Sequence, residues 1–284
     1  MTCDIGKCIE DVMSRNLERD ALNVNGQTIS YESLYSQADA ISNTINQVLR
    51  NSNQFIGIFC YKSVEAYAGI LGSLFSKNAY LPINLSLPPE KINKILSISE
   101  CPLVILGEEG VDAFQKLNSG QKKLRVICPN PGKKINELAK NDTNHTYIFP
   151  KDFSLKKIKK DCVQDQDPAY LMFTSGSTGE PKGIVVSHEN LFSYAFYMIK
   201  KYEFTQEDRI SQAPDISFDL SIQDLFSSFL CGGCLYVLPK EVMIAPHKYI
   251  NDNQLTVWTS VPSVGIFMDN LGQLSSNSLP SLRL

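Results

Sequence analysis

The sequence predicts an α/β protein with two mainly parallel sheets flanked by helices. Two series of alternating strand and helix patterns indicate this class, and a segment rich in glycine, serine and threonine separates them. The 284 residues, of which 43% are hydrophobic, can form a sizeable core in one large domain or two smaller lobes. We expect one lobe at about 50–130 and another at about 167–284, joined by a surface connection over 129–165.

The chain opens with a helix and a hairpin before the first series begins. Residues 7–19 have the pattern of a short amphipathic helix. Asn25-Gly26 lies between two short β-rich segments and is typical of a type I′ turn, which predicts a hairpin. From Tyr31 to Leu49, apolar residues recur at spacings of three and four, so this segment is predicted to be a helix with one buried face.

The first alternating series runs to residue 128. Ser63 is a candidate N-cap, and Pro88-Pro89 is suited to opening a helix. We expect strands at 54–61, 103–106 and 124–128, an apolar segment at 79–84, and helices at 64–75, 89–98 and 111–117. The connection after it is rich in Lys, Asn and Asp and has weak periodicity, with an edge strand expected at 147–149. Its lysine run, 156–160, fits a partner-binding patch or a solvated face.

The second alternating series follows the glycine-rich segment. Ser187 can cap a helix over 188–201, which gives His188 a place at a helix start as well as a possible catalytic role. We expect strands at 209–212, 234–238 and 255–259, and helices at 220–230 and 262–271.

The segment between the two series has the composition of a phosphate-binding loop. It lies between two apolar, strand-like segments, 169–173 and 184–186. Glycines allow positive φ and bring backbone N–H groups close to an anion, hydroxyls donate hydrogen bonds, and a lysine supplies positive charge. The residues are Thr174, Ser175, Gly176, Ser177, Thr178, Gly179, Lys182 and Gly183. The spacing differs from a Walker A loop, and a solvated hairpin loop is the alternative interpretation.

A second polar segment, Ser217 to Ser221, precedes an apolar helix. Asp219 or Ser221 could cap that helix by accepting hydrogen bonds from its first-turn amides. Asp219 could instead be a carboxylate that pairs with a substrate ammonium group, which would select strongly for substrates with an amine. The residues alone leave both interpretations open.

Composition and cysteine usage exclude several functional classes. A net charge of −3 argues against a nucleic-acid partner, and the N-terminal residues lack the pattern of a signal peptide. The most apolar long stretch, 64–83, contains charged and polar residues and a proline, so no membrane span is expected. The eight cysteines are scattered. Cys231 and Cys234 could form a redox pair or half of a zinc site, but we favour buried free thiols in a reducing cytoplasm, with no metal site.

Residues 170–183, with the pattern Tyr-x-x-Phe-Thr-Ser-Gly-Ser-Thr-Gly-x-Pro-Lys-Gly, resemble the signature loop of the adenylate-forming superfamily. Residues 29–34, 78–84 and the Phe218 region resemble three further motifs, although Ser76-Lys77-Asn78 stands where Ala-Gly is usual. The resemblance implies that the residues from Thr174 to Lys182 hold the β- and γ-phosphates of ATP while a substrate carboxylate attacks the α-phosphate.

The resemblance is nearest to adenylation domains of nonribosomal peptide synthetases and to D-alanine carrier-protein ligases. It implies that Asp219, in Phe-Asp-Leu-Ser, binds the α-amino group of an amino acid, and that Phe218, Leu220, Gln223 and Thr259 belong to the substrate pocket. The enzyme would form aminoacyl-AMP and load the phosphopantetheine thiol of a carrier protein.

Members of this superfamily continue beyond the point that matches Leu284. The continuation carries the Mg²⁺-placing and adenine-stacking segment, a ribose-binding aspartate and a catalytic lysine. We therefore expect an N-terminal portion with little activity of its own, whether as a recombinant fragment, a gene fragment or one half of a split enzyme with a separate C-terminal half. The alternatives are a non-catalytic module that binds a nucleotide or a carrier protein, and carboxylate activation like that of acyl-CoA synthetases.

Overall fold

The computed structural model describes residues 3–49, 51–117, 123–154, 156, 162–175, 180–244 and 246–284. The chain forms two compact units, each built from two separate stretches. The first contains residues 1–10 and 34–193, and the second contains residues 11–33 and 194–284. The lobes expected at 50–130 and 167–284 remain a prediction about domain organisation.

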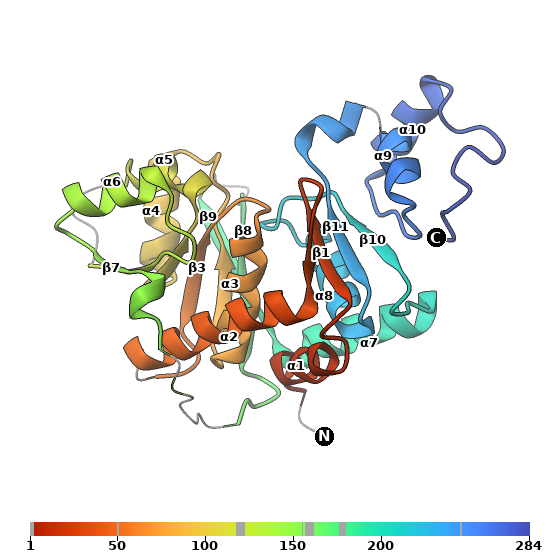
Figure 1. Ribbon diagram of the computed structural model, residues 1–284. Coiled ribbons are helices and arrows are strands. Elements are labelled where there is room, and N and C mark those ends of the chain that lie inside the picture. Colours follow the sequence, from red (N-terminus) through yellow and green to blue (C-terminus); the bar gives the residue numbers. More distant parts are fainter. Residues whose placement is uncertain are drawn as a thin grey trace. The chain divides into compact units, whose positions relative to one another are not determined.

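The first unit contains a seven-stranded sheet in the order β7-β6-β5-β3-β4-β8-β9 (Figure 1). All neighbouring pairs are parallel except β8 and β9, which are antiparallel. Its strands are β3 (Phe55–Phe59), β4 (Ala79–Pro82), β5 (Leu103–Leu106), β6 (Arg125–Ile127), β7 (Thr146–Ile148), β8 (Pro168–Ser175) and β9 (Pro181–Ser187). Its helices include α3 (Val64–Phe75), α4 (Pro89–Ile98), α5 (Val111–Phe114) and α6 (Lys133–Asn141). The predicted mainly parallel α/β class is confirmed.

The second unit contains a four-stranded sheet in the order β10-β11-β1-β2. β11 is parallel to both β10 and β1, and β1 pairs with β2 as an antiparallel hairpin. The strands are β1 (Asp20–Val24), β2 (Gln27–Ser30), β10 (Arg209–Gln212) and β11 (Cys234–Val237). The helices are α8 (Leu220–Cys231), α9 (Pro246–Asn253) and α10 (Pro262–Asn270). Three further helices have residues in both units: α1 (Ile5–Arg15), α2 (Tyr31–Val48) and α7 (His188–Tyr202).

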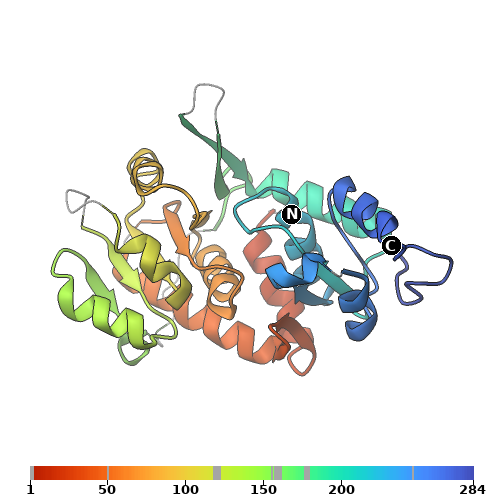
Figure 2. The ribbon, with the colours of Figure 1, turned by 90° about the horizontal axis from the view of Figure 1, so that it is seen from above.

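The hairpin of β8 and β9 ends the seven-stranded sheet and projects from it in Figure 2. Most of β9 is exposed, including the side chains of Ile184 and Val185. β8 is more buried along its apolar first half, because it also pairs with β4. The strand pair therefore rests on the sheet at one end and carries the glycine-rich segment at the other.

Of one turn and two helix caps predicted from the sequence, the turn and one cap are present in the structure. The type I′ prediction is confirmed, because Asn25 and Gly26 have φ of 52° and 78° between β1 and β2. Ser187 caps α7 as expected, accepting a hydrogen bond from the Asn190 N–H at 3.2 Å. The Ser63 side chain does not cap α3; its hydroxyl donates to Glu109 Oε1 at 2.5 Å instead.

Two helices were not expected, and one expected strand does not form as a named element. α6 lies in the charged connection, and only Ile135 and Leu138 of this helix are buried. So few apolar positions gave little periodicity. α9 begins at Pro246 and buries Pro246 and Ile250. The strand predicted at 255–259 is reduced to a single parallel bridge between Ile210 and Val257 at the edge of the four-stranded sheet. None of the described helices is long and apolar enough to cross a membrane.

Candidate active site

The predicted phosphate loop lies in the first unit, between β8 and β9. The antiparallel register places Thr174 opposite Lys182 and Ser175 opposite Pro181. Residues directly opposite each other have their side chains on the same face of an antiparallel pair, so Thr174 and Lys182 present their side chains on one face of this hairpin. Both residues are exposed. The loop itself, Gly176, Ser177, Thr178 and Gly179, is outside the described residues.

Two charged residues, Glu180 and Lys182, lie beside the loop, and only Glu180 has an ionic partner among the described residues. Glu180 forms an ion pair with Lys94 of α4. Lys182, two residues later, has no ion pair or hydrogen bond of its side chain among the residues that the structure describes. Within the described part of the chain, Lys182 therefore offers a positive charge without an ionic partner, which suits a polyphosphate.

Gly183 has a packing role that differs from the one expected. Its φ is not in the left-handed region, so it does not provide the positive φ expected of the loop glycines. A Cβ atom at this position would lie 3.0 Å from Leu171 Cδ1 and 3.1 Å from Phe173 Cζ. Glycine therefore fits here because β8 side chains pack directly over the β9 backbone.

Asp219 lies immediately before α8, in the second unit, and the capping interpretation does not apply to it. Its backbone is helical, with φ of −60° and ψ of −27°, and its side chain makes no cap hydrogen bond. Ser221 uses its hydroxyl to donate to the Phe218 carbonyl at 2.6 Å, so it does not cap the helix either. The turn before the helix is held by Asp215, which accepts hydrogen bonds from the N–H and hydroxyl of Ser217 at 2.9 and 2.7 Å.

The Asp219 carboxylate is consequently available to a ligand. It is exposed and makes no hydrogen bond or ion pair with any described residue. The side chain of Phe218, the preceding residue, is 57% exposed. A carboxylate beside an exposed aromatic ring, on a turn that other residues stabilise, can accept an amine without disturbing the fold.

Leu220 and Gln223 lie on the first turn of α8. Tyr194, which was not predicted from the sequence, contacts Gln223. The Tyr194 hydroxyl, on α7, donates to Gln223 Oε1 at 3.2 Å. Burial, together with the negative charge of Asp224, raises the pKa of the Tyr194 phenol, so this hydroxyl stays protonated and can donate. Tyr194 is 41% exposed, and no sequence motif identified it.

Thr259 lies beyond the Val257 bridge, at the edge of the four-stranded sheet. Its backbone N–H donates to the hydroxyl of the buried Ser211, in β10, at 2.9 Å. Thr259 and the α8 residues therefore belong to one compact unit, whereas the phosphate loop belongs to the other.

His188 has a structural environment. It is 1% exposed, and its Nδ1 accepts a hydrogen bond from the Ile5 N–H at 3.3 Å. Burial lowers the pKa of the imidazole, and the positive charge of Lys77 adds to this, whereas Asp4 and Asp167 oppose it. A neutral acceptor that anchors the first turn of α1 needs no catalytic role.

Cys231 and Cys234 are both free thiols, the first partly buried and the second buried. Gly232, between them, ends α8 with φ of 80°, and the Cys231 thiol donates to the Thr205 carbonyl at 3.2 Å. Burial raises the pKa of both thiols to about 12, which disfavours the thiolate that redox chemistry or zinc binding requires. Within the described part of the chain, no group of three or more His, Cys, Asp or Glu side chains is arranged to hold a metal ion.

The sequence pattern of AMP-binding enzymes matches residues 9–284, nearly the whole chain. The chain belongs to this family. A D-alanine–D-alanyl carrier protein ligase of Listeria monocytogenes is 31% identical over 263 residues, which are 89% of this chain and 48% of that protein. Gramicidin S synthase 1 of Brevibacillus brevis is 26% identical over 97% of this chain and 24% of its own length.

Solved structures of adenylation domains share the AMP-binding fold described above. The Vibrio cholerae adenylation domain AlmE, in complex with glycyl-adenosine-5′-phosphate, superposes with a TM-score of 0.89 and is 29% identical, covering 100% of this chain and 54% of that one. The chain spans about half the length of the D-alanine ligases and of this adenylation domain.

Proposed function

We propose that this AMP-binding chain supplies the ATP phosphate loop and the amino-acid pocket of an enzyme that adenylates an amino acid. The observation that carries the proposal is the exposed, unbonded carboxylate of Asp219 at the start of α8. The relatives support it, since they include a ligase named for D-alanine and an adenylation domain solved with a glycyl adenylate.

The proposed reaction has two steps. A carboxylate oxygen of the amino acid bonds to the α-phosphorus of ATP, and the bond from that phosphorus to the bridging oxygen breaks, which releases pyrophosphate and leaves aminoacyl-AMP. The phosphopantetheine thiol of a carrier protein then loses its proton and bonds to the acyl carbon, and AMP leaves. The second step and its partner are supported by the carrier-protein ligase among the relatives.

The described residues fit the two substrates by charge. Lys182 and Thr174 present an ammonium and a hydroxyl that suit the β- and γ-phosphates, together with Ser175 and the loop from Gly176 to Gly179. Asp219 would hold the α-ammonium group, beside the ring of Phe218. The first step brings anionic groups together, so cationic stabilisation is a major requirement. Mg²⁺ would supply part of it when bound with ATP, and we assign no residue of this chain to it.

The side-chain pocket is proposed to include Leu220, Gln223 and Thr259. Leu220 contributes an apolar surface, whereas Gln223 and Thr259 contribute polar groups. The Tyr194 hydroxyl donates to the side-chain oxygen of Gln223. The side-chain amide nitrogen of Gln223 has no hydrogen bond to a described residue. The pocket is therefore mixed in polarity.

The length of the chain relative to its relatives bears on activity. Because it spans about half of the D-alanine ligases it matches, we expect little adenylation by this chain alone and restored adenylation when the remaining portion is supplied. A split enzyme with a separate C-terminal half would behave in this way.

The test is ATP–pyrophosphate exchange with each of the twenty amino acids and D-alanine, with and without a supplied C-terminal portion of an AMP-binding enzyme. Exchange that depends on one or a few amino acids, and is weak without the C-terminal portion, is the expected result. Full exchange by the chain alone would contradict the need for a second portion. Intact ATP binding with no exchange in any mixture would contradict adenylation and favour a binding module.

A further inference from the structure

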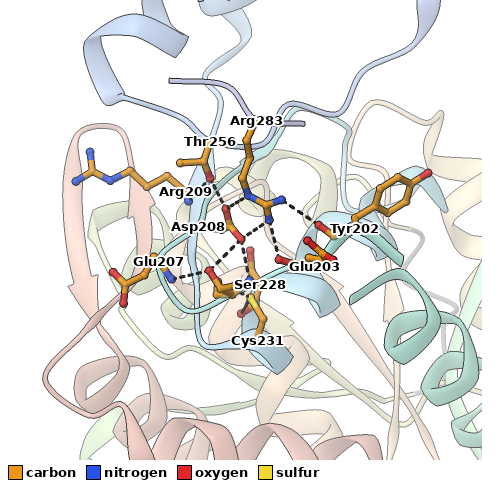
Figure 3. Close-up of polar contacts among 10 residues, drawn as sticks. Tyr202, Glu203, Glu207, Asp208, Arg209, Ser228, Cys231, Thr256 and Arg283 are labelled. Carbon is orange, nitrogen blue, oxygen red and sulfur yellow. Dashed lines mark hydrogen bonds and ion pairs between the residues drawn. The ribbon is translucent and has the colours of Figure 1, made fainter. Parts of the chain in front are cut away.

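The buried carboxylate of Asp208, in the second unit, bonds to residues that are far apart in the sequence (Figure 3). The Asp208 side chain is 3% exposed. It accepts hydrogen bonds from Nε and Nη2 of Arg283 at 2.8 and 2.6 Å, from the Thr256 hydroxyl at 2.7 Å, and from the Thr205 N–H at 2.8 Å. Such a complete set of partners stabilises the charged form. Burial acts to raise the pKa of Asp208, but the bonds from Arg283 and Thr256 outweigh it and lower the pKa.

The Arg283 guanidinium joins this carboxylate to the end of α7. It donates to the carbonyl oxygens of Tyr202 and Glu203 at 3.0 and 3.1 Å, and its carbon lies 5.9 Å from the centre of the Phe204 ring. Figure 3 shows the guanidinium between Asp208 and these two carbonyl groups. The Arg283 side chain therefore caps α7 and pairs with the buried Asp208. This requires the end of α7, Asp208 and the C-terminal segment to keep a fixed arrangement.

The segment that contains Thr259 depends on this arrangement because its pairing with β10 is short. Only the Ile210–Val257 bridge joins them as strands, with backbone hydrogen bonds between residues 209–211 and 256–257 of 3.0 to 3.2 Å. A short ladder specifies register weakly, and a shift by one residue exchanges the two faces of a strand. Such a shift would replace Thr259 with Trp258 or Ser260 on the face that Thr259 occupies.

Thr256 is the residue that fixes the register. Its hydroxyl donates to Asp208 and accepts a hydrogen bond from the Arg209 N–H at 3.0 Å. Its carbonyl oxygen accepts from the Arg283 N–H at 2.9 Å, and the Trp258 N–H donates to the Leu284 carbonyl at 3.0 Å. Three residues before Thr259, the chain is therefore held from both sides by groups that Asp208 and Arg283 orient.

We propose that Asp208 and Arg283 are positioning residues, which hold Thr256 in register and thereby place Thr259 in the wall of the amino-acid pocket. We call Asp208, Arg283 and Thr256 the Asp208 clamp. This inference rests on the proposed function, because it gives the clamp a role in substrate recognition in addition to folding. Neither Asp208 nor Arg283 has a hydrogen bond to Asp219, so loss of these side chains is expected to act on recognition of the amino-acid side chain.

The test uses Asp208→Asn, Thr256→Val and a matched control, Glu207→Gln. Thr256→Val keeps the shape of the side chain and removes only the hydroxyl, so it answers the question even where Asp208→Asn prevents folding. Glu207 precedes Asp208 and forms an exposed ion pair with Arg19 at 3.1 Å, outside the clamp. Hydrogen exchange of the chain itself should rise over residues 256–259 in the two clamp variants and stay unchanged in the control.

Exchange kinetics with the supplied C-terminal portion provide the functional readout. Both clamp variants should raise the KM for the amino acid by about tenfold or more, with the KM for ATP unchanged, because small misplacements at a substrate site are costly. An unchanged amino-acid KM, or equal rises in both KM values, would overturn the inference. A wild-type enzyme that needs no amino acid would instead contradict the proposed function, and the inference with it.

Discussion

At the residue scale, Asp219 and Lys182 are the two charged residues predicted to contact the substrates. Each is exposed, and neither has an ionic partner among the described residues, although Glu180 and Asp215, close to them in sequence, are both engaged. An exposed charge without a partner costs the free protein little and contributes little to its stability. Such a charge can instead contribute to the binding free energy of a ligand of opposite charge.

Opposite effects are expected when these two residues are substituted in the completed enzyme. Asp219→Ala should raise the KM for the amino acid by about 30-fold or more, which corresponds to roughly 2 kcal/mol for a truncated charge pair, with little change in the KM for ATP. Lys182→Ala should raise the KM for ATP and leave that of the amino acid nearly unchanged. Asp252→Ala, at an exposed acid on α9, is the control and should change neither.

Steady-state kinetics with one substrate varied at a time would measure these effects. Equal losses for both substrates, accompanied by a lower unfolding midpoint, would show that the two residues support folding and would contradict their proposed roles.

His188 should make stability depend on pH. Its pKa is lowered in the folded protein, so below an unfolded value of about 6.5 the unfolded chain binds more protons than the folded one. The free energy of unfolding should therefore be highest above this pH and fall as the pH drops below it. His188→Asn, whose side-chain oxygen can accept the Ile5 hydrogen bond, should reduce this slope. His145, whose pKa is also lowered, should preserve part of it.

Urea titrations of both proteins between about pH 7.5 and 5 would check this, since the slope measures the difference in bound protons. Identical slopes for the wild type and His188→Asn would contradict the structural role assigned to this histidine.

At the element scale, the junction of α8 and β11 shows why glycine lies within the cysteine pair. Gly232 ends α8 in the left-handed conformation, with φ of 80°, and its N–H donates to the Ser228 carbonyl at 3.1 Å. The Tyr31 hydroxyl donates to the carbonyl of the following residue, Gly233, at 2.7 Å. Gly232 therefore lets the chain reverse, and Gly233 fits where a Cβ atom would lie 2.9 Å from the Asp208 carbonyl oxygen. The two glycines explain the spacing of the cysteines without a metal or redox role.

Substituting two glycines by alanine should have opposite effects on stability. Gly232→Ala should lower the free energy of unfolding by roughly 1 to 2 kcal/mol, because a Cβ atom disfavours this conformation and would lie 3.1 Å from Asn16 Nδ2. Gly265→Ala is the matched control. It lies within α10, where nothing is within 4 Å of the new Cβ, so it should raise stability by up to about 1 kcal/mol. Chemical denaturation of each variant gives both values, and a neutral Gly232→Ala would contradict the assigned turn.

Local patterns predicted elements well where the signal is local. The Asn25-Gly26 turn, the buried face of α2 and the Ser187 cap each depend on residues a few positions apart, and all three are present. The helix α6 was missed because its two buried residues provide too little periodicity. The strand expected at 255–259 was wrong as a strand, because β propensity does not reveal how few partners an edge segment will have.

At the scale of the whole molecule, pairing between distant segments was beyond sequence patterns. The hairpin of β1 and β2 joins β11, more than 200 residues later, and β8 joins β4, about 90 residues earlier. The Asp208 clamp likewise joins residues 205, 208, 256 and 283. No local periodicity encodes such contacts, so the sequence predicted the fold class and could not predict these pairings.

The candidate site was found by two different routes. The phosphate loop was visible from residue chemistry alone, since hydroxyls, glycines and a lysine gather within ten positions. Asp219 remained ambiguous until the structure showed that its carboxylate does not cap α8. Tyr194 and Asp208 carried no motif, and only their hydrogen bonds reveal them.

We propose that Asp219 makes the completed enzyme select substrates that carry an α-amino group. The most direct measurement compares pyrophosphate exchange by the completed enzyme with its preferred amino acid and with the same acid lacking the α-amino group. We expect the kcat/KM to be about 30-fold or more higher for the amino acid, corresponding to roughly 2 kcal/mol for an unpaired carboxylate. Equal or faster exchange with the deamino acid would contradict it and indicate activation of simple carboxylic acids.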